Sequence, residues 1–239
     1  MADRDGMQID GARVLVAGAT GVIGGKLVDA LVERGARVVP AGRDEERLAA
    51  LGERTGTTPQ VLDAVDADSV RRAVDAAVAE LGGLDLLVVT VGAAGFGKAV
   101  DLDAAVTEEL FAVNVQAPMA LVRAAAPALT ESEHGTAVVL SAILADLPTV
   151  GMADYSAAKS ALSTWLGVLR KEQRRAFRVV DVRPPHLDTG LDQRALAGEP
   201  PRLPEPVASD EVVTAILDAL AGDQGELVWE AKEKKLTPR

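Results

Sequence analysis

Short apolar runs alternate with longer segments of helical periodicity along most of the chain. The segment 13–18, RVLVAG, has the Val- and Leu-rich character of a buried strand that ends at a glycine. In the next segment, 24–35, apolar residues recur at three- and four-residue spacings, which predicts a helix that stops at Gly35. The same alternation continues to the C-terminus. Strands are expected at 13–18, 36–43, 58–66, 84–92, 135–142, 178–185 and 225–230. Helices are expected at 24–35, 44–56, 67–83, about 103–129, through Tyr155 to near Phe177, and about 209–220.

This order of elements predicts an α/β protein with a doubly wound parallel sheet, a three-layer Rossmann fold. Strands that alternate with helices form right-handed βαβ units, whose helices cover both faces of the sheet. With 239 residues, 48% of them hydrophobic and only 3% aromatic, the chain is expected to form one domain, 1–239, around a core of Val, Leu and Ala. The Pro- and Gly-rich segment 184–206 is too long for an ordinary connection, and we expect a substrate lid there.

Composition narrows the classes of function. A net charge of −11 disfavours nucleic acid and anionic membrane surfaces as partners. Without cysteine the chain has no disulfide and no thiolate chemistry, and its two histidines, His134 and His186, are too far apart in sequence for a histidine-rich metal site. No metal is therefore expected. The N-terminus does not resemble a signal peptide, and no apolar run reaches about 18 residues, so a cytoplasmic protein is expected.

A glycine-rich turn, VAGATGVIGG, joins the first strand to the first helix. Such a turn lets the backbone approach a pyrophosphate at the helix N-terminus, so it predicts dinucleotide binding. The tip of the second strand carries Gly42 and Arg43 where an acid would bind a ribose 2′-OH, so NADP(H) is favoured over NAD(H). NAD(H) stays possible because Asp44 has two interpretations, a ribose ligand or a helix cap.

The stretch DYSAAKSAL contains the one tyrosine of the chain, Tyr155, four residues before Lys159. Residues at this spacing share a helix face. An ammonium beside a phenol favours the phenolate, which suits the phenol for acid–base chemistry near neutral pH.

Together these motifs resemble the short-chain dehydrogenase/reductase family over nearly the whole chain. GATGVIG, LDAVDADSV, LLVVTVGA, FAVNVQAP, VVLSA, YSAAK and DVRPPHLDTG stand in the family's order. The resemblance implies that Tyr155 is the catalytic acid/base and that Lys159 binds the nicotinamide ribose and lowers the phenol's pKa. It implies further that Asn114 supports a proton-relay water, that Asp63 contacts the adenine, and that Thr189 lies near the nicotinamide carboxamide. The expected cofactor-binding residues are Gly18, Thr20, Gly21, Ile23, Gly24, Arg43, Asp63, Gly92, Lys159 and Thr189.

The chain departs from the family pattern at several positions. Residues 89–92, VTVG, replace the family's NNAG, so other hydrogen bonds must steady the central strands. The catalytic serine usually stands thirteen residues before the tyrosine, where this chain has Ala142; Ser141 is one residue earlier. We expect a longer loop at 142–152 to bring Ser141 into that catalytic role. The alternative is a strand-end serine that bonds its own backbone.

The sequence therefore predicts an NADP(H)-dependent oxidoreductase that transfers hydride between the nicotinamide and a ketone or secondary alcohol. Its substrate is expected to be small and mostly apolar, because apolar residues lie in the segments that would border the site: Phe96, Ile143, Leu144, Leu147, Val150, Met152, Leu187 and Leu191. His186 faces either the substrate or solvent. The resemblance also implies a homo-oligomer, dimer or tetramer, formed through the helices that hold Asn114 and Tyr155. Two alternatives stay open: a cofactor-binding sensor or scaffold with decayed redox activity, and an epimerase or dehydratase, which the glycine spacing of 18, 21 and 24 suggests.

Overall fold

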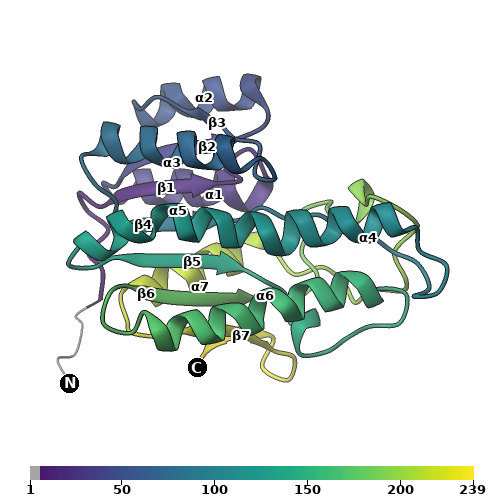
Figure 1. Cartoon of the computed structure of the whole chain (residues 1–239). Coiled ribbons are helices and arrows are strands. Elements are labelled where there is room, and N and C mark those ends of the chain that lie inside the picture. The colour runs from purple at the N-terminus through teal and green to yellow at the C-terminus, as the bar shows by residue number, and fades with distance from the viewer. Residues whose placement is uncertain (1–5) are drawn as a thin grey trace.

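The computed structural model describes residues 6–239 as one eight-stranded sheet between two layers of helices (Figure 1). The strands run in the order β3-β2-β1-β4-β5-β6-β7-β8, so the chain builds outward from β1 in one direction and from β4 in the other. This confirms the predicted doubly wound α/β fold. The parallel strands are β1 (Arg13–Ala17), β2 (Arg37–Gly42), β3 (Gln60–Val61), β4 (Leu86–Val89), β5 (Thr136–Leu140), β6 (Arg178–Arg183) and β7 (Glu226–Glu230). The last strand, β8 (Lys235–Pro238), pairs antiparallel with β7.

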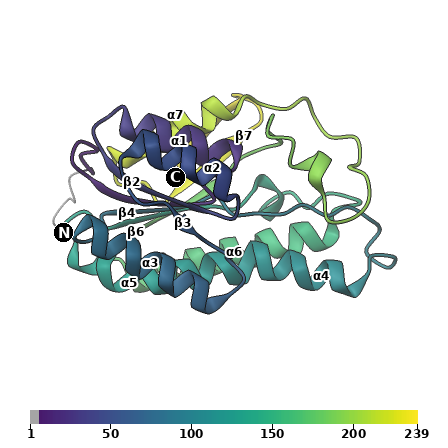
Figure 2. The same ribbon diagram turned by 90° about the horizontal axis from the view of Figure 1, so that it is seen from above.

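The helices lie on both faces of the sheet, as Figure 2 shows from above. One face carries α1 (Val22–Val32), α2 (Glu45–Thr55) and α7 (Ser209–Leu220). The other carries α3 (Ala67–Leu81), α4 (Ala104–Phe111), α5 (Ala117–Glu131) and α6 (Ala153–Glu172). Three short segments complete the elements: the π-helical η1 (Ala112–Gln116) and the 3₁₀ turns η2 (Ile143–Ala145) and η3 (Asp192–Arg194).

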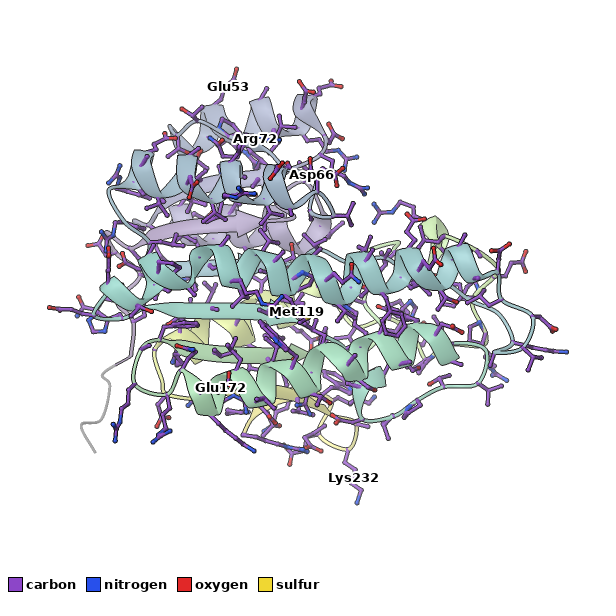
Figure 3. The ribbon with its side chains drawn as sticks, in the orientation of Figure 1. Glu53, Asp66, Arg72, Met119, Glu172 and Lys232 are labelled. Carbon is purple, nitrogen blue, oxygen red and sulfur yellow. The ribbon has the colours of Figure 1, made fainter. Side chains whose placement is uncertain are left out.

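Alternation of side chains along the strands divides the core between the two faces. In β1, Val14 and Val16 pack under α1 and α7, whereas Leu15 and Ala17 pack under α3 and α5. All four side chains of β4 are buried, as expected of a central parallel strand. Charged side chains such as those of Glu53, Arg72 and Lys232 project outward from the surface (Figure 3).

Two expected elements differ from those observed, and one observed strand was not expected. The expected strand 58–66 is paired only at Gln60–Val61, because the chain there turns outward to the N-cap of α3 at Asp66. The expected helix 103–129 is divided by the π-helical segment η1, in which the Ala117 N–H bonds the Ala112 carbonyl five residues earlier. The hairpin strand β8 was not expected, because its four residues follow β7 through a short turn and end in a proline. No helix within residues 6–239 has the length and apolarity to cross a bilayer.

The carboxyl ends of the parallel strands meet along one edge of the sheet. The loops that follow β1, β2, β4, β5 and β6 gather there, beside the N-terminal half of α6 (Figure 1). The segment 184–206 is drawn in lime green at the same end of the molecule in Figure 2. In an open α/β sheet this edge is where ligands bind.

Candidate active site

The glycine-rich turn after β1 is too crowded for side chains at two of its positions. Gly18 has a φ of 91°, and a Cβ atom there would lie 2.5 Å from the Thr90 hydroxyl. A Cβ atom on Gly24 would lie 2.2 Å from the Gly18 carbonyl oxygen. Gly21 is the N-cap of α1 and supplies no side-chain acceptor, so the first-turn amides of this helix are left to a ligand or to water. Ile23 packs against the core behind the turn.

The tip of β2 offers a cation in place of an acid. A Cβ atom on Gly42 would lie 2.8 Å from the Thr20 hydroxyl, which leaves little room for a carboxylate at this position. Arg43 follows and is exposed. Asp44 is the N-cap of α2: its side chain accepts a hydrogen bond of 3.0 Å from the Arg47 amide. The helix-cap interpretation of Asp44 is therefore the one that the structure shows.

Sequence reasoning missed Arg47, whose guanidinium reaches the same corner. It donates a 3.1 Å hydrogen bond to the Thr20 carbonyl and forms a 3.2 Å ion pair with Asp44. The sequence feature that could have identified Arg47 is its position three residues after a capping aspartate, in the helix turn nearest the glycine-rich segment. Asp63 is exposed after β3, and its carboxylate accepts a 3.2 Å hydrogen bond from the Val65 amide.

Thr90 supplies hydrogen bonds at the position where the family motif has asparagine. Its hydroxyl lies 3.2 Å from both the Ala17 and the Gly18 carbonyl oxygens, and its amide donates to Ala17 at 2.9 Å. The end of β4 is thus tied directly to the glycine-rich turn. These Thr90 hydrogen bonds connect the central strands β1 and β4 in a chain that lacks the family's asparagines.

Asn114 lies in the π-helical segment and is fully buried. Its side-chain amide donates 2.9 Å hydrogen bonds to the Leu110 and Ala93 carbonyls, and its oxygen accepts from the Ala93 amide at 3.2 Å. Such wide helical turns are frequent at functional sites. Here one side chain in this turn holds the loop after β4 by both backbone groups of a single residue, the N–H and the C=O of Ala93.

Tyr155 and Lys159 lie one helical turn apart near the start of α6, as the spacing predicts. The Lys159 Nζ atom is 5.9 Å from the centre of the Tyr155 ring and donates a 3.3 Å hydrogen bond to the Leu140 carbonyl at the end of β5. A Cβ atom on Gly92 would lie 3.6 Å from this Nζ and 3.3 Å from the Asn114 side-chain oxygen. The fold therefore brings Gly92, Asn114 and Lys159 together from three segments.

Burial shifts the pKa values of Tyr155 and Lys159 and so determines their protonation states. Tyr155 is 8% exposed, and burial raises its pKa to about 12. Burial lowers the pKa of Lys159 to about 8, although the charge of Asp181 acts to raise it. The phenol's pKa thus moves away from neutrality, opposite to the expected effect of the ammonium, because burial removes the ring from solvent. At neutral pH this leaves a protonated phenol beside a largely protonated amine.

The Ser141 hydroxyl is hydrogen-bonded within the protein, at the contact between the end of β5 and β6. Ser141 is 4% exposed, and its hydroxyl donates to the buried carboxylate of Asp181 on β6. A hydroxyl has one proton, so this bond leaves none for a substrate oxygen. In this structure Ser141 is a strand-end serine that bonds a neighbouring side chain, and its expected catalytic role stays a prediction.

Side chains of the segment 184–206 pack against the apolar cluster that includes Tyr155. At its base Leu187 and Val207 form an isolated β-bridge, and farther along Leu196 donates a 2.8 Å hydrogen bond to the Ala94 carbonyl. An apolar cluster fills the space below, consisting of Ala94, Phe96, Leu110, Met152 and Tyr155 with Leu102, Val106, Leu144, Leu191, Ala195, Leu196 and Leu203. Four of the apolar residues expected at the substrate site, Phe96, Leu144, Met152 and Leu191, belong to this cluster.

The other expected residues lie apart from this cluster. Leu187 packs in the core under α1 and α7, whereas Val150 and Leu147 are 93% and 61% exposed. Within the segment 184–206, Arg194 donates to the Thr189 carbonyl at 3.1 Å, and the His186 Nδ1 atom is 3.0 Å from the Pro204 carbonyl oxygen. His186 therefore has a partner inside that segment.

Comparison with known proteins gives consistent matches. The model of the family described as "short chain dehydrogenase" matches residues 12–200. The chain is 34% identical over 183 residues to the cyclic-di-GMP-binding biofilm dispersal mediator protein of Escherichia coli K12, a match that covers 75% of this chain and 74% of that protein. It is 30% identical over 235 residues to the uncharacterized oxidoreductase DltE of Bacillus subtilis, covering 95% and 91% of the two chains.

Solved structures of other proteins are similar to this chain over more than nine-tenths of its length. A short chain dehydrogenase of Burkholderia cenocepacia in complex with NADP superimposes with a TM-score of 0.82 at 30% identity, covering 95% of this chain and 91% of that one. A short chain dehydrogenase of Shigella flexneri complexed with NADP gives a TM-score of 0.78 at 25% identity, covering 92% and 94%.

Proposed function

The chain belongs to the short-chain dehydrogenase/reductase family, and from that premise we propose that it is an NADP(H)-dependent oxidoreductase interconverting a ketone and a secondary alcohol. The observation that carries this proposal is the buried Tyr155 beside Lys159, at the sheet edge where Gly92 and Asn114 converge. A phenol and an ammonium at this place are suited to exchange a proton with a carbonyl oxygen.

The residues present fit a nicotinamide dinucleotide. The turn of Gly18, Gly21 and Gly24 would hold the pyrophosphate against the first-turn amides of α1, with Thr20 and Ile23 shaping the turn. Asp63 is assigned to the adenine, Gly92 and Lys159 to the nicotinamide ribose, and Thr189 to the carboxamide. When bound, the cofactor supplies or accepts the hydride.

A cationic corner supports NADP(H) over NAD(H). Arg43 is exposed at the tip of β2, and Gly42 leaves little room for the acid that would bind a ribose 2′-OH. Arg47 adds a second guanidinium beside Thr20. Guanidinium groups suit a 2′-phosphate because they present several N–H donors in one plane. Two similar structures are complexes with NADP, in agreement with this assignment.

Tyr155 would act as the general acid in the direction of reduction. Because burial holds its pKa near 12, the phenol keeps its proton at neutral pH and can donate it to the oxygen as negative charge develops there. The charge of Lys159 would then stabilise the phenolate that remains. In the direction of oxidation the same phenolate takes the proton from the alcohol.

The substrate oxygen would depend on Tyr155 for its hydrogen bond. The Ser141 hydroxyl donates its hydrogen bond to Asp181, and Ala142, thirteen residues before Tyr155, has no hydroxyl. Asn114, whose amide is bonded to backbone groups, would position the loop after β4 rather than touch the substrate. We therefore assign the acid, its charged neighbour and the loop support to Tyr155, Lys159 and Asn114.

The segment 184–206 would be the lid over an apolar substrate. It covers Tyr155 with leucine side chains, and this phenol is only 8% exposed, so the segment must move before a substrate can reach it. The side chains that a substrate would then contact are apolar, which favours a mostly apolar ketone or alcohol.

Turnover of NADPH against a panel of apolar ketones, with chromatography of the products, tests the proposal. We expect NADPH oxidation that depends on the ketone, with one alcohol formed for each NADPH consumed. Binding of NADPH without consumption would contradict the proposal in favour of a sensor or scaffold. Conversion of a sugar or hydroxyacyl substrate without net change in the cofactor would contradict it in favour of an epimerase or dehydratase.

A further inference from the structure

We propose that Asp181 is a positioning residue of this site, a buried counter-charge on β6 that holds the end of β5 and acts on Lys159 across the interface between the sheet and α6. The inference rests on the proposed role of Lys159 and goes beyond it, because Asp181 touches neither the expected cofactor residues nor Tyr155.

Asp181 is fully buried on β6 and makes three side-chain hydrogen bonds. Its carboxylate accepts from the hydroxyl of Ser141, from the hydroxyl of Ser163 at 2.6 Å, and from the Arg183 Nε atom at 2.8 Å. These partners come from the residue after β5, from α6 and from β6, so one carboxylate joins the three elements that frame the catalytic pair.

The contact with Ser163 brings the carboxylate to the catalytic face of α6. Tyr155, Lys159 and Ser163 follow one another at four-residue spacing and form a single stripe along this helix. Ser163 bonds Asp181, and the amine of Lys159 bonds the Leu140 carbonyl immediately before Ser141. The carboxylate therefore lies behind the amine, on the side away from Tyr155.

Arg183 extends the cluster to the loop before α6. Its Nη1 atom lies 3.0 Å from both carboxylate oxygens of Asp146, and its Nη2 atom lies 3.3 Å from Glu226 on β7. The Ser160 hydroxyl adds a 3.1 Å bond to the Ala145 carbonyl in the same loop. The segment between Ser141 and α6 is thus fastened to the cluster at both Ser141 and Asp146.

Stability alone does not account for a charge at this position. Replacing a buried ion pair by packed apolar side chains is often neutral or stabilising, so the pair itself is weak grounds for a purely structural role. The charged and titratable groups facing Lys159 are Tyr155 on its own helix and Asp181 on β6, with Arg183 beyond. Leu140, Gly92 and Asn114 present uncharged groups from the other sides. Asp181 is the anion in this set, and its charge acts to raise the pKa of Lys159 against burial.

The direct test is an NMR titration of the Lys159 side chain in the unliganded protein. Lysine labelled with ¹³C at Cε gives seven signals, and the one lost in Lys159→Arg identifies the site. We expect Asp181→Asn to lower the Lys159 pKa by about 1, a tenfold change in its protonation equilibrium. An unchanged pKa would overturn the proposal.

Ser163→Ala is the matched control, because it removes one hydrogen bond from the same carboxylate and leaves its charge in place. The Lys159 pKa should stay within a few tenths of the wild-type value in this variant. An equal fall in both variants would assign the effect to general loosening of the structure and overturn the counter-charge. If Asp181→Asn does not fold, Arg183→Gln tests the proposal in the opposite direction. Without the neighbouring guanidinium, the Asp181 carboxylate should raise the Lys159 pKa. A fall or no change in this pKa contradicts the proposal.

The titration also separates this inference from the proposed function. If no ketone is reduced but the Lys159 pKa still falls in Asp181→Asn, the proposed function fails and the electrostatic role of Asp181 stands. If ketones are reduced but the pKa is unmoved, only the role of Asp181 fails. In an active enzyme the alkaline limb of kcat/KM for reduction should move to lower pH in Asp181→Asn and stay in place in Ser163→Ala.

Discussion

The Lys159 ammonium lies 5.9 Å from the centre of the Tyr155 ring, one turn along α6, and both side chains are buried. Burial acts on them in opposite directions, raising the pKa of the phenol to about 12 and lowering that of the amine to about 8. Both changes favour the uncharged form. In the free protein the phenol therefore keeps the proton that it can donate. The positive charge of Lys159 beside it would stabilise the phenolate after the proton has been transferred.

The amine should make stability depend on pH. The pKa of Lys159 is lower in the folded protein, about 8, than its ordinary value of 10.5, so between these values the unfolded chain binds more protons. The free energy of unfolding should therefore rise with pH in this window, by on the order of 2 kcal/mol between pH 8 and 10. Denaturant titrations of the wild type and Lys159→Met measure it. The free energy of unfolding of the wild type minus that of Lys159→Met should rise with pH, and a difference that does not change with pH would show that the amine is not desolvated.

Arg43 should decide the preference between cofactors. Arg43→Ala is expected to weaken NADPH binding about tenfold, since a charge-assisted contact to phosphate contributes about 1.5 kcal/mol or more, and to leave NADH binding nearly unchanged. Fluorescence titration with each cofactor measures both affinities. Arg54→Ala is the matched control on α2, because Arg54 forms its 2.7 Å ion pair with Asp29. Equal losses for NADPH and NADH in Arg43→Ala would contradict the assignment.

Two adjacent glycines should respond differently to alanine. A Cβ atom on Gly24 would lie 2.2 Å from a backbone oxygen, whereas on Gly25 its nearest neighbour is 3.4 Å away. Gly24→Ala should lower stability by about 1–3 kcal/mol and weaken NADPH binding. Gly25→Ala should leave stability unchanged or raise it by about 0.5 kcal/mol, because alanine favours a helix. Thermal unfolding with and without NADPH measures both effects. Similar behaviour of the two variants would mean that the turn is not packed as described.

Docking of the lid should be visible in the single tyrosine. Gly198 has a φ of 69°, and a Cβ atom there would lie 2.2 Å from the Phe96 carbonyl oxygen, so Gly198→Ala should lift the lid from the loop after β4. Ultraviolet absorbance then follows the phenol directly. We expect the Tyr155 pKa to fall from about 12 toward its ordinary value of 10 in this variant. Gly190→Ala, with a φ of 65° but its nearest atom 3.8 Å away, carries the same backbone strain without the collision and should keep the high pKa. The same pKa in Gly198→Ala as in the wild type would contradict the covering role.

Sequence patterns were sufficient for the layered fold because the fold depends on local periodicity. The apolar runs that became β1, β4 and β5 were recognisable, and the helix at 209–220 was predicted with its observed bounds. The pattern did not predict β8, whose pairing depends on a turn after β7 rather than on an apolar run. It also missed the π-helical turn at Asn114, because this turn interrupts the apolar periodicity of a long helical pattern over only five residues.

The candidate site was predictable where motif and spacing coincide, and not where partners come from distant strands. The four-residue spacing placed Tyr155 and Lys159 on one helix face. The partner of Ser141 could not be read from its neighbours, because Asp181 lies 40 residues away and is brought close only by the pairing of β5 with β6. For the same reason burial, which governs the pKa of Tyr155, was not visible in the sequence.

Replacing the Tyr155 hydroxyl is the most direct test of the central claim. Tyr155→Phe keeps the ring that packs beneath the lid and removes the one group assigned to proton transfer. We expect NADPH to bind within about twofold of the wild type, while kcat for ketone reduction falls by at least about 10²-fold, in line with the usual contribution of a general acid. A variant that binds NADPH normally and reduces ketone at a rate near that of the wild type would contradict the account.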